Sequence, residues 1–433
     1  MKSLKWNSVL SALLVAAITM TACVKSDQEA ANEGKEPQAP SPSSAPEVTN
    51  KPVELTIWAT SMPPASFEKI TGQIKRKYPN FSFKLILESD LKLPDAVASN
   101  TNIDILFGSL SAMPNLITVG MNGDIADLIK KHNFDLNRLS PQPLEMMKKM
   151  NDGKLFGLPL NILNMVMFYN KDLFDKFGEA PPKDGMTWED TYELAKKMTR
   201  ADGGVQYRGF TASRNFLALY NQRSLELIDP KTKKAAFGSE PWRLFINTIV
   251  PFYTISPGYQ IGEAPASFLK GSVAMEANLN SNYPNDNPFN WDVVSLPTFK
   301  DLPGVAGQPG PTYLTVSTTS KHRDEAFLSI AQMLSEEVQL ERSKDGSVTV
   351  LNNFKSAIDV FGQNAPALKG KNVKAITPTK MAEPAVFSKY NTIAQNEISS
   401  LIMRVATGEK DLNTALRESA EAIDKQIQAD LAK

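Results

Sequence analysis

The sequence predicts an α/β protein with more than one lobe, and three observations indicate this class. The chain has 433 residues, of which 42% are hydrophobic, so it can form a large core but is too long for one compact lobe. From residue 53 onward, strand-like and helix-like patterns alternate. Amphipathic helical faces then continue to the C-terminus. Strands that alternate with helices are typical of a parallel sheet covered by helices.

The first strand, helix and strand are predicted between residues 53 and 107. In residues 53–58, Val, Leu and Ile alternate with Glu, Thr and Trp, which is the period of a strand. Pro63 and Pro64 suit the first turn of a helix. Residues 81–87 and 103–107 are the next strand candidates. This order within about 35 residues predicts a βαβ unit with parallel pairing.

Four further helical faces are visible later in the chain. Thr187 and Asp190 resemble a capping box, with Asp where Glu or Gln is usual, and predict a helix through Met198. Apolar residues at helical spacing predict one helix across residues 327–338. The last two faces are formed by Phe387, Tyr390, Ala394, Ile398, Leu401 and Val405, and then by Leu412, Leu416, Ile423 and Ile427.

The charge and the cysteine count exclude several classes of function. The chain has 47 Lys and Arg against 47 Asp and Glu, whereas binding to nucleic acid phosphates needs clustered basic residues in excess. One Cys cannot form an internal disulfide, and two distant His residues do not form a soft-ligand metal cluster. No D-x-[DN]-x-[DN]-G calcium loop is present. We therefore expect no nucleic-acid partner, no cofactor and no metal.

Residues 1–22 have the order of a secretory signal. Lys2 and Lys5 precede an uncharged run over residues 9–20, and small residues follow it. The run is too short to span a bilayer. The sequence Met20-Thr21-Ala22-Cys23 resembles a bacterial lipobox, although Leu is commoner than Met at its first position. This resemblance implies that Cys23 is lipidated and becomes the first mature residue.

A plain signal peptide with an incidental Cys is the alternative reading of the same residues. Two acyl chains hold a protein on a membrane much better than one, so a diacylglyceryl group would be an effective anchor. Removal of residues 1–22 deletes two lysines and no acids, so the mature balance becomes 45 − 47 = −2.

Residues 24–52 are predicted to be a disordered tether. They contain no aromatic residue and are rich in Pro, Ser, Ala and Glu, so they cannot bury enough apolar surface to offset the entropy lost on ordering. A flexible coil of this length has an end-to-end distance of roughly 30 Å. Such a segment would hold a folded body away from a surface.

Six segments, in order, resemble the extracellular solute-binding proteins of ABC importers, the family that includes maltose-binding protein. Any one of them is weak alone, but six in the right order are hard to produce by chance. They are residues 151–159 (G-K-x-Y-G-x-P, with Phe156 at the aromatic place), 168–174 (Y-Y-N-K-D-L-F), 181–189 (P-P and T-W-E, with a longer gap), 268–275 (F-x-x-G-x-x-A-M), 296–299 (x-L-P) and 407–416 (G, then A-L).

The resemblance implies a two-lobed, periplasmic-binding-protein-like (type II) fold with a hinge and an interlobe cleft. We expect lobe 1 to comprise residues 53–161 and about 297–350, and lobe 2 residues 162–296 and about 351–433. The hinge candidates are residues 162–165, residues 296–300 and the stretch after Val350. The resemblance also implies a monomer with no enzymatic activity, which is anchored to the outer face of the cell membrane through Cys23 and delivers its solute to an ABC permease.

The candidate ligand contacts follow from the rule that parallel sheets bind ligands at the carboxyl ends of their strands. The rule selects the loops after Trp58, Phe107 and Met275, and residues 161–164. These segments are rich in Asn, whose amide matches vicinal hydroxyls, and an aromatic face can pack on a pyranose ring. A carbohydrate is therefore predicted, with contacts from Ser61, Ser109, Asn161, Asn164, Asn278 and Asn280, and with Trp58 or Tyr313 as the stacking platform.

Other interpretations remain open from the residues alone. Each Asn could be a turn or helix cap, and Trp58 could belong to the core. A sensor that presents its solute to a membrane receptor would have the same sequence features. A glycoside hydrolase needs two facing carboxylates, which sequence spacing cannot reveal. A Ser/His/Asp hydrolase is disfavoured because no G-x-S-x-G elbow is present, and His132 and His322 are both expected to be solvated.

Overall fold

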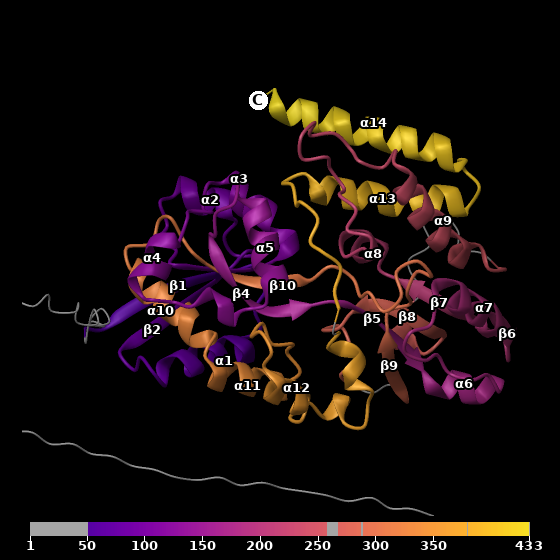
Figure 1. Ribbon diagram of the computed structural model, residues 1–433, viewed down its shortest axis with the longest axis horizontal. Coiled ribbons are helices and arrows are strands. Elements are labelled where there is room, and N and C mark those ends of the chain that lie inside the picture. Colours follow the sequence, from indigo (N-terminus) through magenta and orange to yellow (C-terminus); the bar gives the residue numbers. More distant parts are fainter. Residues whose placement is uncertain (1–50, 258–266, 287–288, 379, 433) are drawn as a thin grey trace, which may run out of the picture. The chain divides into compact units, whose positions relative to one another are not determined.

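The computed structural model describes residues 51–257, 267–286, 289–378 and 380–432 (Figure 1). The predicted signal, Cys23 and the tether through residue 50 lie outside the described residues. The described part contains two five-stranded sheets, with strand orders β2-β1-β3-β10-β4 and β6-β7-β8-β5-β9. The predicted α/β class is thereby confirmed. We call the two sheets, with the helices that pack on them, lobe 1 and lobe 2.

Lobe 1 combines parallel and antiparallel strands. β1 pairs in parallel with β2 and β3, whereas β10 is antiparallel to β3 and β4. Helix α1 packs against α10, and α5 packs against β4. The elements are β1 (Val53–Ala59), α1 (Pro64–Lys75), β2 (Phe81–Leu87), α2 (Leu93–Ala98), β3 (Ile105–Ser109), α3 (Met113–Thr118), α4 (Ala126–Lys131), α5 (Pro141–Met150), β4 (Gly157–Leu163), β10 (Gly310–Val316), α10 (Arg323–Met333), α11 (Glu336–Lys344) and α12 (Lys355–Asp359).

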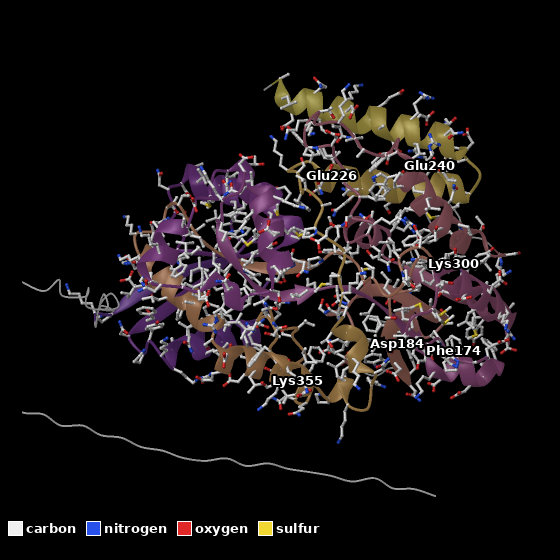
Figure 2. The ribbon with its side chains drawn as sticks, in the orientation of Figure 1. Phe174, Asp184, Glu226, Glu240, Lys300 and Lys355 are labelled. Atoms are coloured by element: carbon white, nitrogen blue, oxygen red, sulfur yellow. The ribbon has the colours of Figure 1, made fainter. Side chains whose placement is uncertain are left out.

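Lobe 2 is built around the antiparallel strands β8, β5 and β9. Phe174 of α6, labelled in Figure 2, packs edge-to-face on Tyr169 of β5. Helix α13 packs against α8, α9 and α14. The elements are β5 (Met165–Asn170), α6 (Lys171–Phe177), α7 (Trp188–Met198), β6 (Arg200–Asp202), β7 (Val205–Ala212), α8 (Arg214–Leu219), α9 (Glu240–Thr254), β8 (Val273–Leu279), β9 (Trp291–Ser295), α13 (Asn391–Ala406) and α14 (Leu412–Leu431).

The predicted capping box at the start of α7 is present. The backbone N–H of Asp190 donates to the Thr187 hydroxyl at 3.1 Å, and the Asp190 carboxylate accepts from the backbone N–H of Thr187 at 3.3 Å. The helix runs from Trp188 to Met198, as predicted. The shorter Asp side chain therefore replaces the usual Glu of this motif.

Three predicted boundaries were wrong, each for an identifiable reason. The third strand covers Ile105–Ser109 rather than residues 103–107, because Ser109 pairs with Thr312 of β10. The single helix predicted across residues 327–338 is split into α10 and α11, because the Ser335 hydroxyl caps a new helix by accepting from the N–H of Val338. Helix α13 begins only at Asn391, because the Asn391 side-chain oxygen accepts from the backbone N–H of Ser388 and holds a turn there, so Phe387 and Tyr390 precede the helix.

Three connections between the lobes are seen in the part of the chain that the structure describes. Asn164 alone joins Leu163 of β4 to Met165 of β5. Residues 296–309 join β9 to β10, and the stretch after α12 leads back to α13. One outer strand of each sheet, β4 in lobe 1 and β9 in lobe 2, contacts a later segment of the chain. The N–H of Ile162 in β4 donates to the carbonyl of Val348, and the Lys371 ammonium donates to the carbonyl of Trp291 in β9.

Glu276 occupies the middle of β8, between its cross-strand partners Phe168 of β5 and Thr211 of β7. Burial raises the pKa of its carboxyl to about 7, although a hydrogen bond with Asn278 opposes this rise. The unfolded chain releases this proton near pH ~4.3, whereas the folded protein retains it to about pH 7. The stability contributed by the neutral carboxyl is therefore lost as the pH rises through this window.

We predict that Glu276→Gln removes this loss of folding stability at higher pH. Between about pH 5 and pH 8, the free energy of unfolding of the variant should rise relative to that of the unmodified protein by on the order of 2 kcal/mol. Urea unfolding across this pH range measures the difference. The exposed Glu68→Gln variant controls for the loss of a carboxylate, and equal pH profiles for E276Q and the unmodified protein would contradict the prediction.

Candidate functional site

The carboxyl ends of several strands in both lobes face the crossing at Asn164. In lobe 1, Ala59 of β1 is level with Phe107 of β3, and Gly310 is paired with Leu163. In lobe 2, the ends of β8 and β7 meet the start of β5 at the corresponding edge. Since one residue joins the two edges, loops from both sheets converge there. This is the arrangement in which α/β proteins place a ligand.

Four of the predicted contact residues keep exposed or half-buried side chains. Ser61 is exposed just after β1, and Ser109 is half-buried at the end of β3. Asn161 is half-buried in β4, and Asn278 is half-buried in β8. The predicted loop after Met275 was wrong, because β8 continues to Leu279 through pairing with β5. Asn278 is consequently held on a strand.

Asn164 and Asn280 are buried, with exposed fractions of 1% and 5%, and they are bonded to each other. The Asn280 side-chain amide donates to the Asn164 side-chain oxygen at 2.7 Å and to the carbonyl of Ile162 at 3.4 Å. The backbone N–H of Asn280 donates to the carbonyl of Asn164 at 2.9 Å. Both residues therefore fasten the end of β8 to the crossing between the lobes.

The two predicted stacking platforms, Trp58 and Tyr313, lie inside lobe 1. Trp58 is 2% exposed, and its indole N–H donates to the carbonyl of Leu91 at 2.8 Å. Tyr313 is fully buried, and its ring lies 6.3 Å from that of Phe156. Neither ring presents a face to a solute in this conformation. Burial also raises the pKa of the Tyr313 hydroxyl, which has no hydrogen-bond partner.

Sequence reasoning missed two polar side chains on neighbouring helices of lobe 2. The side-chain oxygen of Asn215 on α8 and the side-chain nitrogen of Gln395 on α13 are buried without a hydrogen-bond partner. Asn215 follows the end of β7, so the rule on strand ends would have selected it if β7 had been recognised as a strand. No comparable sequence signal marks Gln395, which lies within a helix.

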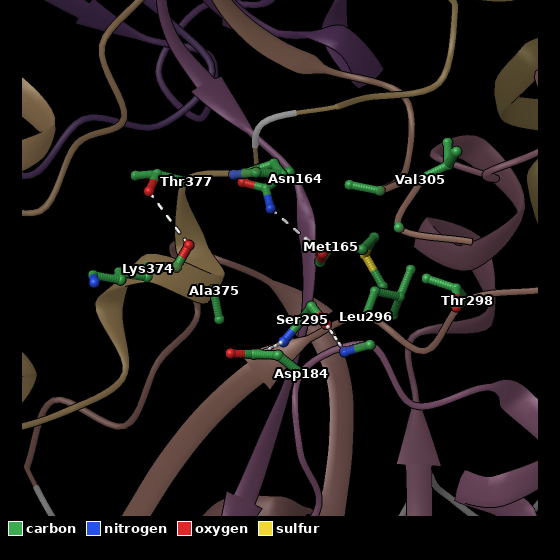
Figure 3. A pocket seen from close by; sticks show the side chains of 14 residues that line it. Asn164, Met165, Asp184, Ser295, Leu296, Thr298, Val305, Lys374, Ala375 and Thr377 are labelled. Carbon is green, nitrogen blue, oxygen red and sulfur yellow. Dashed lines mark hydrogen bonds between the residues drawn. The ribbon is translucent and has the colours of Figure 1, made fainter. Parts of the chain in front are cut away.

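Two hollows adjoin the crossing segments, next to strands β4 and β9. They measure about 200 Å³ and 540 Å³ and share Thr377 and Pro378. Figure 3 shows the smaller one, in which an Asp184 carboxylate oxygen accepts from the backbone N–H of Ser295 at 2.7 Å. Asn164 is the one predicted contact residue that lines it. Neither hollow is lined by Ser61 or Ser109.

His132 is not the solvated residue that the sequence suggested. Its side chain is 6% exposed, its Nε2 lies 2.8 Å from a carboxylate oxygen of Asp324, and its ring stacks on Phe327. The polar Lys-Lys-His-Asn sequence around His132 gave no indication that this side chain is buried, because the residues that cover it belong to α10, a distant part of the chain.

Within the described ranges, no group of three or more His, Cys, Asp or Glu side chains could hold a metal ion. Among the same residues, no helix is both long enough and apolar enough to cross a membrane.

The chain is similar to proteins that bind solutes outside the cell. The model of the bacterial extracellular solute-binding protein family matches residues 63–340. The galactooligosaccharide-binding protein of Bacillus subtilis (strain 168) is 24% identical over 432 residues, with 90% of this chain and 93% of that protein covered.

Two solved structures have the same fold. A cyclo/maltodextrin-binding protein complexed with maltotetraose matches with a TM-score of 0.68 at 18% identity, covering 88% of this chain and 99% of the other. An ABC substrate-binding protein from Listeria monocytogenes in complex with cycloalternan matches with a TM-score of 0.67 at 20% identity, covering 87% and 99%. The two-lobed type II fold expected from the sequence is confirmed. With its family match across most of the folded part, this chain belongs to the bacterial extracellular solute-binding proteins.

Proposed function

We propose that this protein captures a sugar or oligosaccharide between its lobes and delivers it to the permease of an ABC importer. The observation that carries the proposal is the chemistry of the facing sheet edges. Ser61 and Ser109 supply hydroxyls from lobe 1, while Asn278 and Asn215 supply amides from lobe 2. Hydroxyls and amides donate and accept side by side, which suits the vicinal hydroxyls of a sugar.

The names of similar proteins support the same solute class. The Bacillus subtilis relative is named a galactooligosaccharide-binding protein, and a second one from that organism is named an arabinooligosaccharide-binding protein. The two structural neighbours hold maltotetraose and cycloalternan. These relatives differ in the sugar they bind, so they support a carbohydrate without selecting one.

The contacts predicted from the sequence enter this proposal with different roles. Ser61, Ser109, Asn161 and Asn278 are proposed to contact the solute directly, with Asn215 as an additional contact. Asn164 and Asn280 are proposed to hold the crossing between the lobes, because their amides are already bonded to each other. Trp58 and Tyr313 would contact a solute only if their surroundings rearranged.

A binding role without turnover is proposed. A glycoside hydrolase would need two carboxylates across the bound sugar. Glu276 of β8 has a carboxyl with a raised pKa, but this residue lies within the lobe 2 sheet, between Phe168 and Thr211. A sensor that presents its solute to a membrane receptor would use the same site, and the identity of the membrane partner distinguishes sensing from transport.

The location is proposed to be the outer face of the cell membrane. The family is extracellular, which agrees with the secretory signal in residues 1–22. The lipobox-like sequence before Cys23 supports cleavage and lipidation there, with residues 24–52 as the tether to the folded lobes. One protein molecule carries both lobes, so a monomer suffices for binding.

A panel of neutral sugars is expected to contain at least one that raises the melting temperature of the purified protein. A ligand that binds only the folded state stabilises it, by about 2.7 kcal/mol at one hundred times its Kd. A thermal-shift screen followed by calorimetry measures this. A silent sugar panel together with stabilisation by amino acids or anions would overturn the carbohydrate assignment.

The same titration tests the proposed contacts. Asn278→Ala should weaken binding of the identified sugar about 5- to 30-fold, which corresponds to the loss of one or two hydrogen bonds. Asn290→Ala, an exposed change elsewhere in lobe 2, is the matched control. Sustained release of reducing sugar by the unmodified protein, abolished by replacement of one carboxylate, would contradict the non-catalytic role.

Cys23→Ser is expected to abolish lipidation. In bacterial cells that process lipoproteins, the unmodified protein should incorporate a labelled fatty acid and remain with the membrane fraction. The variant should incorporate no label and leave that fraction. Ser43→Ala in the predicted tether is the control and should be labelled like the unmodified protein. Equal labelling of the unmodified protein and the Cys23→Ser variant would contradict the assignment of Cys23 as the lipidated residue.

A further inference from the structure

The larger hollow, of about 540 Å³, is separate from the side chains proposed to contact the solute. Its lining comes from the start of α5, from the stretch between Val348 and Phe361 that includes α12, and from residues around Met381 on the way to α13. None of the proposed solute contacts lines it, namely Ser61, Ser109, Asn161, Asn215 and Asn278. Its volume lies within the range of roughly 300–1,000 Å³ that is typical of small-molecule sites.

An apolar wall with two aromatic rings forms one part of this hollow. Phe354 at the start of α12 is half-buried, and Phe361 is 6% exposed. Within the described ranges, neither ring stacks on another aromatic side chain. Ile358 of α12 also lines the hollow, and 48% of it is exposed. The wall is therefore apolar surface that the rest of the described chain leaves uncovered.

Three amide side chains lie beside this wall. Gln142, in the first turn of α5, is half-buried, and Asn352 and Asn353 are exposed just before α12. In the part of the chain that the structure describes, none of these three side-chain amides has a hydrogen-bond partner in the protein. Each amide presents a donor and an acceptor side by side. The hollow therefore combines an apolar wall with free groups that can bind hydroxyls.

The segment that carries two of these amides is already fixed. The backbone N–H of Asn352 donates to the carbonyl of Arg138 at 2.8 Å, and the N–H of Lys355 donates to the carbonyl of Asn353 at 2.9 Å. Leu351 also forms a bridge with Leu139. Since the backbone is held on both sides of the amides, a ligand would lose little affinity to ordering of this segment.

The charges at the hollow favour a neutral ligand. Its lining includes one cation, Lys380, and one anion, Glu383, so it carries no net charge. A wholly apolar ligand would cover the amides without forming hydrogen bonds to them, which is unfavourable. A pyranose ring has an apolar face that packs on an aromatic ring and hydroxyls that pair with amides.

We propose that the larger hollow is a second carbohydrate-binding site, in which the ring of Phe354 packs on a sugar ring and the amides of Gln142, Asn352 and Asn353 bind its hydroxyls. The inference goes beyond the proposed function, because this site binds a sugar independently of the solute held at the facing sheet edges.

The test observes the methyl group of Met381, which lines the same hollow. The full chain carrying Cys23→Ser, which prevents lipidation, is isotope-labelled at its methionine methyl groups, and a Met381→Leu variant identifies the resonance. Galactose, arabinose, glucose and maltotetraose are then titrated in turn. At least one of them should shift the Met381 resonance in a saturable manner.

Variants of the wall separate stacking from general packing. Phe354→Ala should raise the midpoint of the Met381 titration about 5- to 10-fold, because the sugar loses its aromatic platform. Phe354→Tyr keeps the ring and should leave the midpoint close to that of the unmodified protein.

A variant of the amides tests the hydroxyl contacts without straining the backbone. Asn353 has a φ of 53°, which glycine adopts readily, so Asn353→Gly removes the amide and should raise the midpoint about 3- to 10-fold. Asn100→Gly is the matched control, because Asn100 is exposed, has a φ of 52° and does not line the hollow. Asn278→Ala, a change at the proposed solute site, should also leave the midpoint unchanged.

The absence of a saturable Met381 shift with all four sugars would overturn the proposal. So would a midpoint that responds to Asn278→Ala and not to Phe354→Ala, because the resonance would then report on the solute site. A shift caused by toluene but by none of the sugars would assign the hollow to an apolar ligand instead. The proposed function is judged separately, by the thermal-shift screen and the effect of Asn278→Ala on binding of its sugar.

Discussion

The arrangement of this protein depends on the buried amide side chains that tie the crossing segments to lobe 2. Gln222 and Gln308 satisfy backbone carbonyls on segments that belong to no strand, and Asn280 donates to the carbonyl of Ile162 near the end of β4. An unpaired carbonyl buried in such a place would cost about 1–3 kcal/mol, so these amides make irregular backbone tolerable in the interior. They also fasten part of each of the three connections to lobe 2 or to one another.

The fastening of the connecting segments to lobe 2 affects how a solute could be captured. The hydroxyl and amide side chains at the facing edges lie close to the ends of the strands, so they move with the sheets. A rotation confined to a few torsions brings such groups together without distorting either sheet. Closure of this kind excludes water from the polar contacts, and hydrogen bonds formed there become stronger.

Much of the fold could be predicted because its signals are local. The capping box at Thr187, the β1-α1-β2 unit and the last helix each depend on neighbouring residues. The candidate site could be predicted only in part. Whether Trp58 faces a cleft or a core is decided by packing with distant segments, including Leu91, and sequence position does not reveal it. The extent of β3 likewise depends on pairing with β10, some two hundred residues later.

The covered outer strands have one further consequence, which concerns the chain before it reaches its final state. A protein that folds beside many identical copies is at risk of intermolecular pairing while its strand edges are exposed. In lobe 1, the edge of β4 is covered when Val348 joins it, and in lobe 2, Lys371 caps the edge of β9. Both covering segments come late in the sequence. These two edges, at β4 and β9, are therefore covered only after the last third of the chain has folded onto the sheets.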